Sequence, residues 1–231
     1  MKNNNLIKTI FFTFLLIISA NVFSQSTFSF HFGGAFPMGN FGSDDFDSKH
    51  TSGAGTGFNV GMQFNYQLNE NGLGLFGEAN FNYNGLQSDY KDDLDNYFDI
   101  PSSADITYYK FLNFPISAGL SYTFAANDKV SLLCNAGLAV NFCKTTDFVA
   151  EYNDNKGKIS ADMMTSFGFK IGGGVLLNNK VTIEVNYFGL GSPDLKTTIK
   201  FIEDGEVTYK DKETYKSKDI AILNLTVGFR F

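Results

Sequence analysis

Apolar and polar residues alternate along most of this chain. From Phe58 to Leu68, every even-numbered residue is apolar, and each odd-numbered residue between them is polar or glycine. A period of two is typical of a β-strand with one apolar face. The same pattern recurs in seven other segments, so the sequence predicts eight strands: Thr27–Phe36, Gly57–Leu68, Leu73–Asn84, Tyr108–Phe124, Val130–Cys143, Thr165–Leu177, Val181–Gly189 and Ile220–Phe231.

The connections between these segments are alternately short and long. Three are short turns, at residues 69–72, 125–129 and 178–180, and four are much longer, at residues 37–56, 85–107, 144–164 and 190–219. This alternation is typical of antiparallel strands that run up and down, with all tight turns at one end. We therefore predict an all-β fold, an eight-stranded antiparallel up-and-down transmembrane barrel with short periplasmic turns and long extracellular loops.

The distribution of side chains along the strands indicates which face meets lipid. The apolar set is aromatic near both strand ends and aliphatic between them, as expected for a wall that crosses a bilayer. Aromatic residues are expected at the short-turn end (Phe28, Tyr66, Tyr122, Phe124, Phe231) and at the long-loop end (Phe36, Phe58, Tyr83, Tyr108, Phe142, Phe167, Tyr187). A soluble, lipocalin-like barrel with its apolar face inward and a secreted β-sandwich are the alternatives.

The polar set contains four charged residues that we expect inside the barrel. Glu78, Lys170, Glu184 and Arg230 share the parity of the polar residues in their strands, and two acids balance two bases. Eight strands enclose an interior that side chains can fill, so a wide aqueous pore is not expected. We predict that these four residues form a lumen charge network of ion pairs and hydrogen bonds.

Composition supports a single exported domain. The chain has 231 residues, 26 Phe, 11 Tyr and a formal charge of −6, which argues against a basic nucleic-acid-binding face. Lys2 and Lys8 precede an apolar run from Ile10 to Ala20, which is short for a spanning helix and typical of a signal peptide. We predict a signal peptide at residues 1–24, cleavage between Ser24 and Gln25, and a mature domain at residues 25–231.

The chain resembles the outer-membrane β-barrel proteins of Bacteroidetes that are called PorT-like, and the eight-stranded barrels of the OmpX and OmpA type. The resemblance lies in residues 34–41 (GAFPMGNF), in residues 109–116 (YKFLNFPI) and in the terminal Phe231. It implies a location in the outer membrane among its lipid and lipopolysaccharide, and, for a minority of members, a part in secretion or gliding. It also implies an assembly signal, read by the barrel-assembly machinery, at Leu223, Leu225, Val227, Phe229 and Phe231.

No residue pattern points to catalysis. The chain has two histidines. His31 occupies a position of the first strand whose side chain is expected to face the lumen, and His50 lies in an acidic loop. The chain has no nucleophile motif of the G-x-S-x-G type. Cys134 and Cys143 face opposite sides of one predicted strand, about 30 Å apart, so we expect free thiols. We predict no enzymatic activity, no catalytic or cofactor site and no metal site.

The long connections are the expected seat of function. Residues 85–107 carry six Asp against one Lys but do not match a calcium-binding loop. In residues 190–219, Asp204-Gly205 lies between two alternating runs and predicts a hairpin that projects as an exposed ribbon, whose edge could recruit an extended partner. We predict a non-enzymatic protein that acts through long acidic loops in envelope structure, adhesion or a secretion assembly. The alternative is a small-molecule protein, either a narrow transporter of apolar compounds or a soluble ligand binder.

Overall fold

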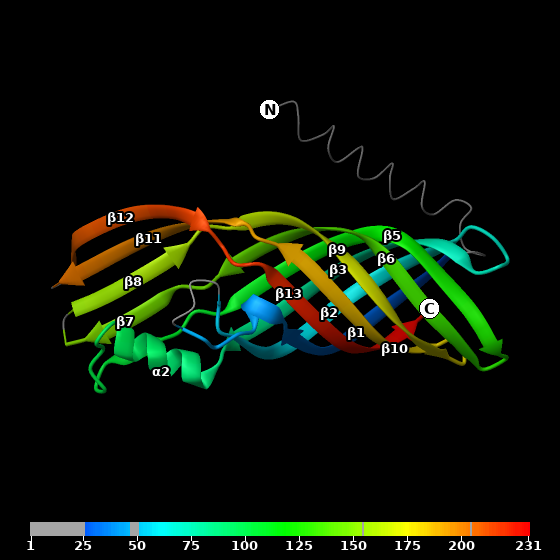
Figure 1. Ribbon diagram of the computed structural model, residues 1–231, viewed down its shortest axis with the longest axis horizontal. Coiled ribbons are helices and arrows are strands. Elements are labelled where there is room, and N and C mark those ends of the chain that lie inside the picture. Colours follow the sequence, from blue (N-terminus) through cyan, green and yellow to red (C-terminus); the bar gives the residue numbers. More distant parts are fainter. Residues whose placement is uncertain (1–25, 47–50, 154, 204) are drawn as a thin grey trace, which may run out of the picture.

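The computed structural model describes residues 26–46, 51–153, 155–203 and 205–231 (Figure 1). The predicted signal peptide, its cleavage site at Ser24 and Gln25, and His50 lie outside the described residues. In the described part of the chain, no helix has the length and apolar character needed to cross a membrane.

Within the described residues, eight antiparallel strands close into a barrel in the order β1-β13-β10-β9-β6-β5-β3-β2 (Figure 1). The predicted eight-stranded up-and-down topology is confirmed. Each strand pairs with its neighbour in sequence across a turn or a long connection, and β1 pairs with β13 to close the ring. The strands are β1 (Ser26–Pro37), β2 (Ala54–Gln67), β3 (Leu73–Leu86), β5 (Phe111–Asn127), β6 (Val130–Thr145), β9 (Met164–Leu177), β10 (Val181–Gly191) and β13 (Ile220–Arg230).

The short turns use residues suited to tight reversal. Asn178 and Asn179, between β9 and β10, both have positive φ angles, of 49° and 56°. Two consecutive residues with positive φ are the signature of the type I′ turn, whose twist matches that of the flanking strands. The turn therefore fixes the register, in which Val181 lies opposite Leu177.

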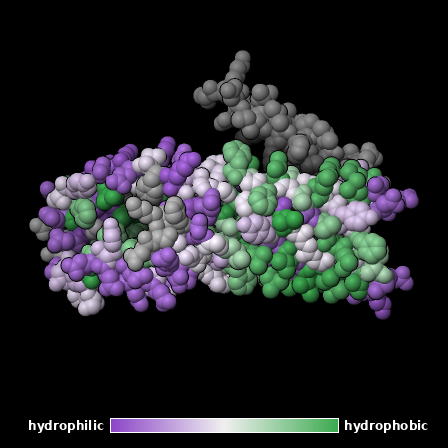
Figure 2. All heavy atoms as spheres, in the orientation of Figure 1, coloured by the Kyte–Doolittle hydropathy of each residue, from purple (hydrophilic) through white to green (hydrophobic). Residues whose placement is uncertain are grey.

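The two faces of the barrel have opposite character. Outward side chains such as Leu138 and Phe167 are 78% and 77% exposed, whereas the inward Asn82 and Asn141 are both 0% exposed. Figure 2 shows hydrophobic residues over much of the barrel half on the face in view. The apolar face points outward, so the inward-facing arrangement of a soluble lipocalin-like barrel is wrong for this chain.

The long connections fold into further strands and helices outside the barrel. In the described residues, they contribute a five-stranded sheet in the order β12-β11-β8-β7-β4, which extends beyond the barrel along its long axis (Figure 1). Hydrophilic residues cover much of this half of the molecule (Figure 2). Its strands are β4 (Asp105–Thr107), β7 (Phe148–Tyr152), β8 (Asn155–Ala161), β11 (Asp194–Glu203) and β12 (Glu206–Lys216).

The hairpin predicted in residues 190–219 is confirmed as β11 and β12, with Gly205 at a φ of 82° in its turn. It is not a free ribbon, because β8 pairs with β11 along the other edge of the hairpin. The exposed edge of the hairpin is therefore that of β12.

Two helical segments also form in the long connections. The 3-10 helix η1 (Gly39–Phe41) follows β1, and α2 (Ser88–Tyr97) occupies the acidic connection between β3 and β5. Strand β5 starts at Phe111 rather than at Tyr108 as predicted. Tyr108 belongs to the region outside the barrel because its phenol donates a hydrogen bond to Asp95 of α2, at 2.6 Å. It is therefore not part of an aromatic girdle.

Candidate functional site

The barrel lumen contains a buried charge cluster. Lys170 of β9 and Glu78 of β3 are 1% and 4% exposed, and the Lys170 ammonium contacts the Glu78 carboxylate. Asn80 donates to the same carboxylate at 2.6 Å, and Nε2 of His31 lies 3.5 Å from it. Because β3 and β9 are not neighbours in the barrel, this cluster ties opposite walls together across the lumen.

Three residues around the cluster explain its geometry. Phe76 and Phe188 point into the lumen and place their rings 5.0 and 5.7 Å from Lys170 Nζ. A ring face attracts a cation and keeps water from it. Gly61 leaves room for the imidazole, since a Cβ at this position would lie 2.2 Å from His31 Nε2.

The other two predicted lumen charges are placed apart from this cluster. Glu184 and Arg230 line a cavity of about 20 Å³ near the end of the barrel that carries the short turns. The structure describes both residues and records no ion pair between them. The register is the reason: Thr226 of β13 lies opposite Glu184, and Arg230 is four residues further along that strand. Of the four expected partners, the fold thus brings Glu78 and Lys170 into contact.

Asparagines fill much of the remaining lumen. Asn59 donates to Asn80 at 3.1 Å and to Asn82 at 3.0 Å, and Asn141 donates to Asn113 at 2.9 Å. Buried amides of this kind require partners because an unpaired polar group inside a protein is costly. Packed side chains therefore occupy the interior of the barrel, as the strand number implies.

An apolar plug closes the lumen at its outer end, which we define as the end that carries the long connections. Phe188, Leu190 and Ile222 are each 0% exposed. They are apolar although they occupy positions whose side chains face the lumen. Sequence analysis did not identify this plug. The available signal was the uninterrupted apolar run from Ile220 to Leu223, because such runs indicate strands that are buried on both faces. The plug comprises Ala35, Phe41, Ala54, Ala139, Cys143, Met164, Phe188, Leu190, Ile220 and Ile222.

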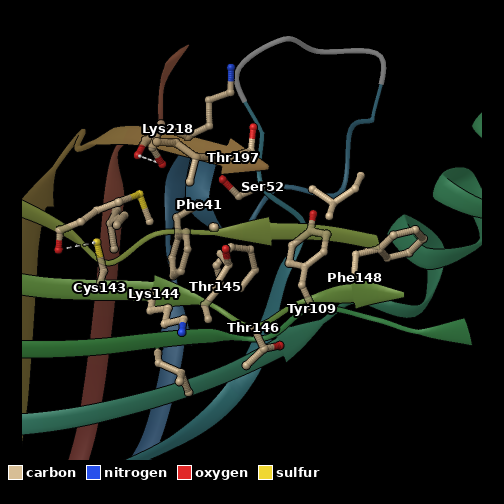
Figure 3. A pocket seen from close by; sticks show the side chains of 18 of the residues that line it. Phe41, Ser52, Tyr109, Cys143, Lys144, Thr145, Thr146, Phe148, Thr197 and Lys218 are labelled. Atoms are coloured by element: carbon tan, nitrogen blue, oxygen red, sulfur yellow. Dashed lines mark hydrogen bonds between the residues drawn. The ribbon is translucent and has the colours of Figure 1, made fainter. Parts of the chain in front are cut away.

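A cavity of about 320 Å³ lies above the plug, between the barrel and the outer sheet. Phe41 and Phe111 form part of its floor, and the outer sheet contributes Phe148, Ile159 and Leu195. In Figure 3, Phe41, Tyr109 and Phe148 lie around this space, with Ser52 and Thr197 near its upper side. Its volume falls at the lower end of the range of small-molecule sites, and most of its lining is apolar.

Helix α2 closes one side of the cavity. Tyr90 and Leu94, four residues apart and therefore on one face, are both 8% exposed and pack with Phe46 and Phe111. Burial and the hydrogen bond to Asp95 raise the pKa of the neighbouring Tyr108 to about 12. The helix thus turns its apolar face to the barrel and leaves most of its acids in solvent.

The structure also shows where the two cysteines and the acidic side chains lie. Among the described residues, Cys134 and Cys143 are free cysteines, the first exposed on the outer wall and the second buried in the plug. The same residues contain no group of three His, Cys, Asp or Glu side chains arranged to hold a metal ion. Outside the barrel, the hydrogen bond with Lys158 lowers the pKa of Asp147.

The C-terminal strand presents its predicted assembly signal to the outside. Leu225, Val227, Phe229 and Phe231 are 50%, 39%, 49% and 77% exposed, and the alternate positions Asn224, Thr226 and Gly228 are buried. Leu223 follows the same outward parity and is partly buried. Four of these residues therefore form one apolar row along β13, and Phe231 continues the row directly after the strand.

A closed barrel of eight strands, with an apolar wall and a packed polar lumen, defines an outer-membrane β-barrel protein. The chain belongs to the family described as "Outer membrane protein beta-barrel domain", which matches residues 10–231. The resemblance seen in the sequence is thereby confirmed at the level of outer-membrane barrels. No protein of curated function matches the chain.

Several solved structures of outer-membrane proteins are similar to this chain at low sequence identity. A major outer membrane protein from Thermus thermophilus is 14% identical, with a TM-score of 0.50 and coverage of 89% of this chain and 99% of that one. OprG from Pseudomonas aeruginosa is 14% identical, with a TM-score of 0.49 and coverage of 90% and 96%. Ail, the attachment invasion locus protein of Yersinia pestis, is 15% identical, with a TM-score of 0.41 and coverage of 90% and 98%.

Proposed function

We propose that this protein is a non-enzymatic outer-membrane barrel that binds a partner outside the cell, in adhesion, envelope structure or a secretion assembly. The observation that carries the proposal is the folding of the long connections into a sheet and a helix. Loops that are already ordered lose less conformational entropy on binding, so a folded outer assembly favours recognition. The resemblance to PorT-like barrels supports a surface role of this kind.

The outer sheet carries features of a binding surface. Phe201, Val207 and Tyr209, near the tip of the hairpin, are 51%, 56% and 50% exposed. Phe201 and Tyr209 also pack against each other, with ring centroids 5.8 Å apart. Exposed aromatic residues of this kind are enriched at protein interfaces, and the edge of β12 could accept an extended segment.

The barrel wall supports the predicted location and biogenesis. We expect the wall to contact outer-membrane lipid and lipopolysaccharide, and the apolar row on β13 to be read by the barrel-assembly machinery. Cell fractionation, comparison of heated and unheated samples on a gel, and surface proteolysis test this arrangement. Outer-membrane recovery, a mobility shift on heating and cleavage within residues 190–219 are expected; release as a soluble protein would contradict the proposal.

Partner binding is tested with the aromatic tip. The double variant Phe201→Ser/Tyr209→Ser removes both exposed rings, and we expect cells that display it to attach less to surfaces or to partner cells. The matched control is Tyr152→Ser, which removes a ring that is 43% exposed at the last residue of β7. Unchanged attachment by cells that carry the double variant at normal surface levels would rule out recognition through this tip.

The cavity above the plug favours a second function, the capture of a small apolar molecule. Its apolar lining and its volume of about 320 Å³ fit a compact ligand, whereas the plug below it favours capture over passage. Leu195→Trp should fill the space and abolish the fluorescence gain of an apolar dye such as N-phenylnaphthylamine. Leu138→Trp adds the same indole to the lipid-facing wall as a control; equal dye binding by both variants would exclude the cavity.

A further inference from the structure

Three lysines form a row across the outer sheet. Lys158 of β8, Lys200 of β11 and Lys210 of β12 lie directly opposite one another in the strand register. Residues paired in this way share a face of the sheet, and neighbouring strands are about 4.8 Å apart. Like charges placed directly opposite each other are destabilising. The repulsion in this row therefore disfavours the strand pairing, and a bound anion would relieve it.

Two more lysines extend the row along the strands. Lys196 and Lys212 have the same parity as Lys200 and Lys210 and therefore lie on the same face. We call these five residues, Lys158, Lys196, Lys200, Lys210 and Lys212, the lysine face. Lys196, Lys210 and Lys212 are exposed, and Lys158 and Lys200 are partly exposed.

Carboxylates do not neutralise most of this face. Lys158 pairs with Asp147, at 2.6 Å. For the other four, the described part of the chain provides no carboxylate oxygen within 4 Å of the ammonium group. The protein as a whole carries a charge of −6, so a local excess of lysine is not a consequence of its composition.

The lysine face points away from the cavity that lies between the barrel and the outer sheet. Ile159, Leu195 and Thr197, on the opposite parity of β8 and β11, line the cavity. Successive side chains in a strand point to opposite sides of the sheet. The lysine face is therefore the solvent side of a sheet that extends from the barrel along its long axis (Figure 1).

We propose that the lysine face binds an extended anionic glycan, a saccharide chain that carries sulfate or phosphate groups. This inference rests on the proposed recognition function and names the chemistry of its partner. The backbone positions of these lysines lie about 5 Å apart across the strands and about 7 Å apart along them, so a flexible chain with closely spaced charges can reach several ammonium groups at once. Thr198 and Thr214 lie on the same face and offer hydroxyl groups to a sugar.

The side chains on this face favour a glycan over a single-stranded nucleic acid. Proteins that bind single strands stack the bases on aromatic side chains. Phe201 and Tyr209 have the parity of the cavity side, and the described residues on the lysine face include no aromatic ring. Its ammonium and hydroxyl groups suit a partner recognised through its charges and its hydroxyls.

The test uses the full mature protein in zwitterionic micelles and measures binding to dextran sulfate. The variant Lys200→Gln/Lys210→Gln removes two charges from the row, and we expect its affinity to fall at least tenfold. The control variant Lys129→Gln/Lys180→Gln removes the same charge from the short turns at the other end of the barrel, and its affinity should stay within twofold of wild type. Neutral dextran should not bind.

A second variant and three contrary results complete the test. Lys196→Gln/Lys212→Gln should also weaken binding, and it replaces the first variant if that variant fails to show heat-modifiable gel mobility. Equal losses in the control variant, no wild-type binding to dextran sulfate, or equal binding of single-stranded DNA of the same charge would overturn the proposal. If wild-type binding is absent while Phe201→Ser/Tyr209→Ser still reduces attachment, the glycan inference fails and the recognition function stands.

Discussion

The pair formed by Lys170 and Glu78 should dominate the stability of the barrel interior. Its side chains are 0% and 1% exposed, so neither charge has access to bulk water. Removal of one member of a buried ion pair typically costs about 3–5 kcal/mol, because the other charge stays buried without its partner. The two single variants should differ within this range because their remaining partners differ.

Lys170→Met leaves the Glu78 carboxylate with the Asn80 amide at 2.6 Å and with His31 nearby, so we expect a loss of about 3 kcal/mol. Glu78→Gln leaves the ammonium with Gln63 Oε1 at 3.5 Å and two aromatic rings, so we expect a loss of about 5 kcal/mol. The double variant should cost about 3 kcal/mol, well below the sum of the two, because no isolated charge remains.

Equilibrium unfolding in urea, followed by circular dichroism and by gel mobility in micelles, measures these values as a double-mutant cycle. Glu151→Gln and Lys156→Met provide the matched control, because that ion pair is 47% and 39% exposed. Exposed pairs contribute at most about 1 kcal/mol. Additive losses from Lys170→Met and Glu78→Gln would refute the reasoning, since they would show that the two charges do not stabilise each other.

Three further predictions concern single residues. The pKa of Tyr108 is raised from 10 to about 12, so this residue should contribute stability that is present below pH 10 and lost as the pH rises through 12. The variant Asp95→Asn should lower the pKa of Tyr108, as measured by phenolate absorbance. Gly33→Ala should reduce the yield of folded barrel in a refolding assay, because a Cβ would lie 1.9 Å from a carbonyl oxygen of β13, and normal folding would contradict this. In micelles, a maleimide should label Cys134 on the outer wall much faster than the buried Cys143, as measured by mass spectrometry of peptides.

Much of the barrel could be predicted because strand alternation is a local property. In the last strand, Leu225 and Val227 are exposed while Asn224 and Thr226 are buried, and this contrast is visible in the order of the residues. Turn residues such as Asn178 and Gly205 likewise carry their preference for positive φ in their own chemistry. Strand number, strand direction and the polarity of each face follow from these local signals.

The candidate site depended on contacts between distant parts of the chain. Strand alternation predicted that Glu78 and Lys170 face the lumen. It could not predict their contact, which joins residues 92 positions apart across the barrel. The same alternation predicts polar residues at the lumen-facing positions that Phe188 and Ile222 occupy. Apolar packing instead seals the outer end of the lumen. Helix α2 in the acidic connection was not predicted either, because it depends on the packing of Tyr90 and Leu94 against residues outside the helix.

The sequence by itself determined a barrel with an apolar wall, since a period of two specifies a strand face without reference to any other strand. Tertiary structure decided the rest. Strand β8 comes from one long connection and β11 and β12 from another, and only their register aligns Lys158, Lys200 and Lys210 in one row. Pairing between separate segments depends on how the closed barrel positions their ends, and this information is not present in any single stretch of residues.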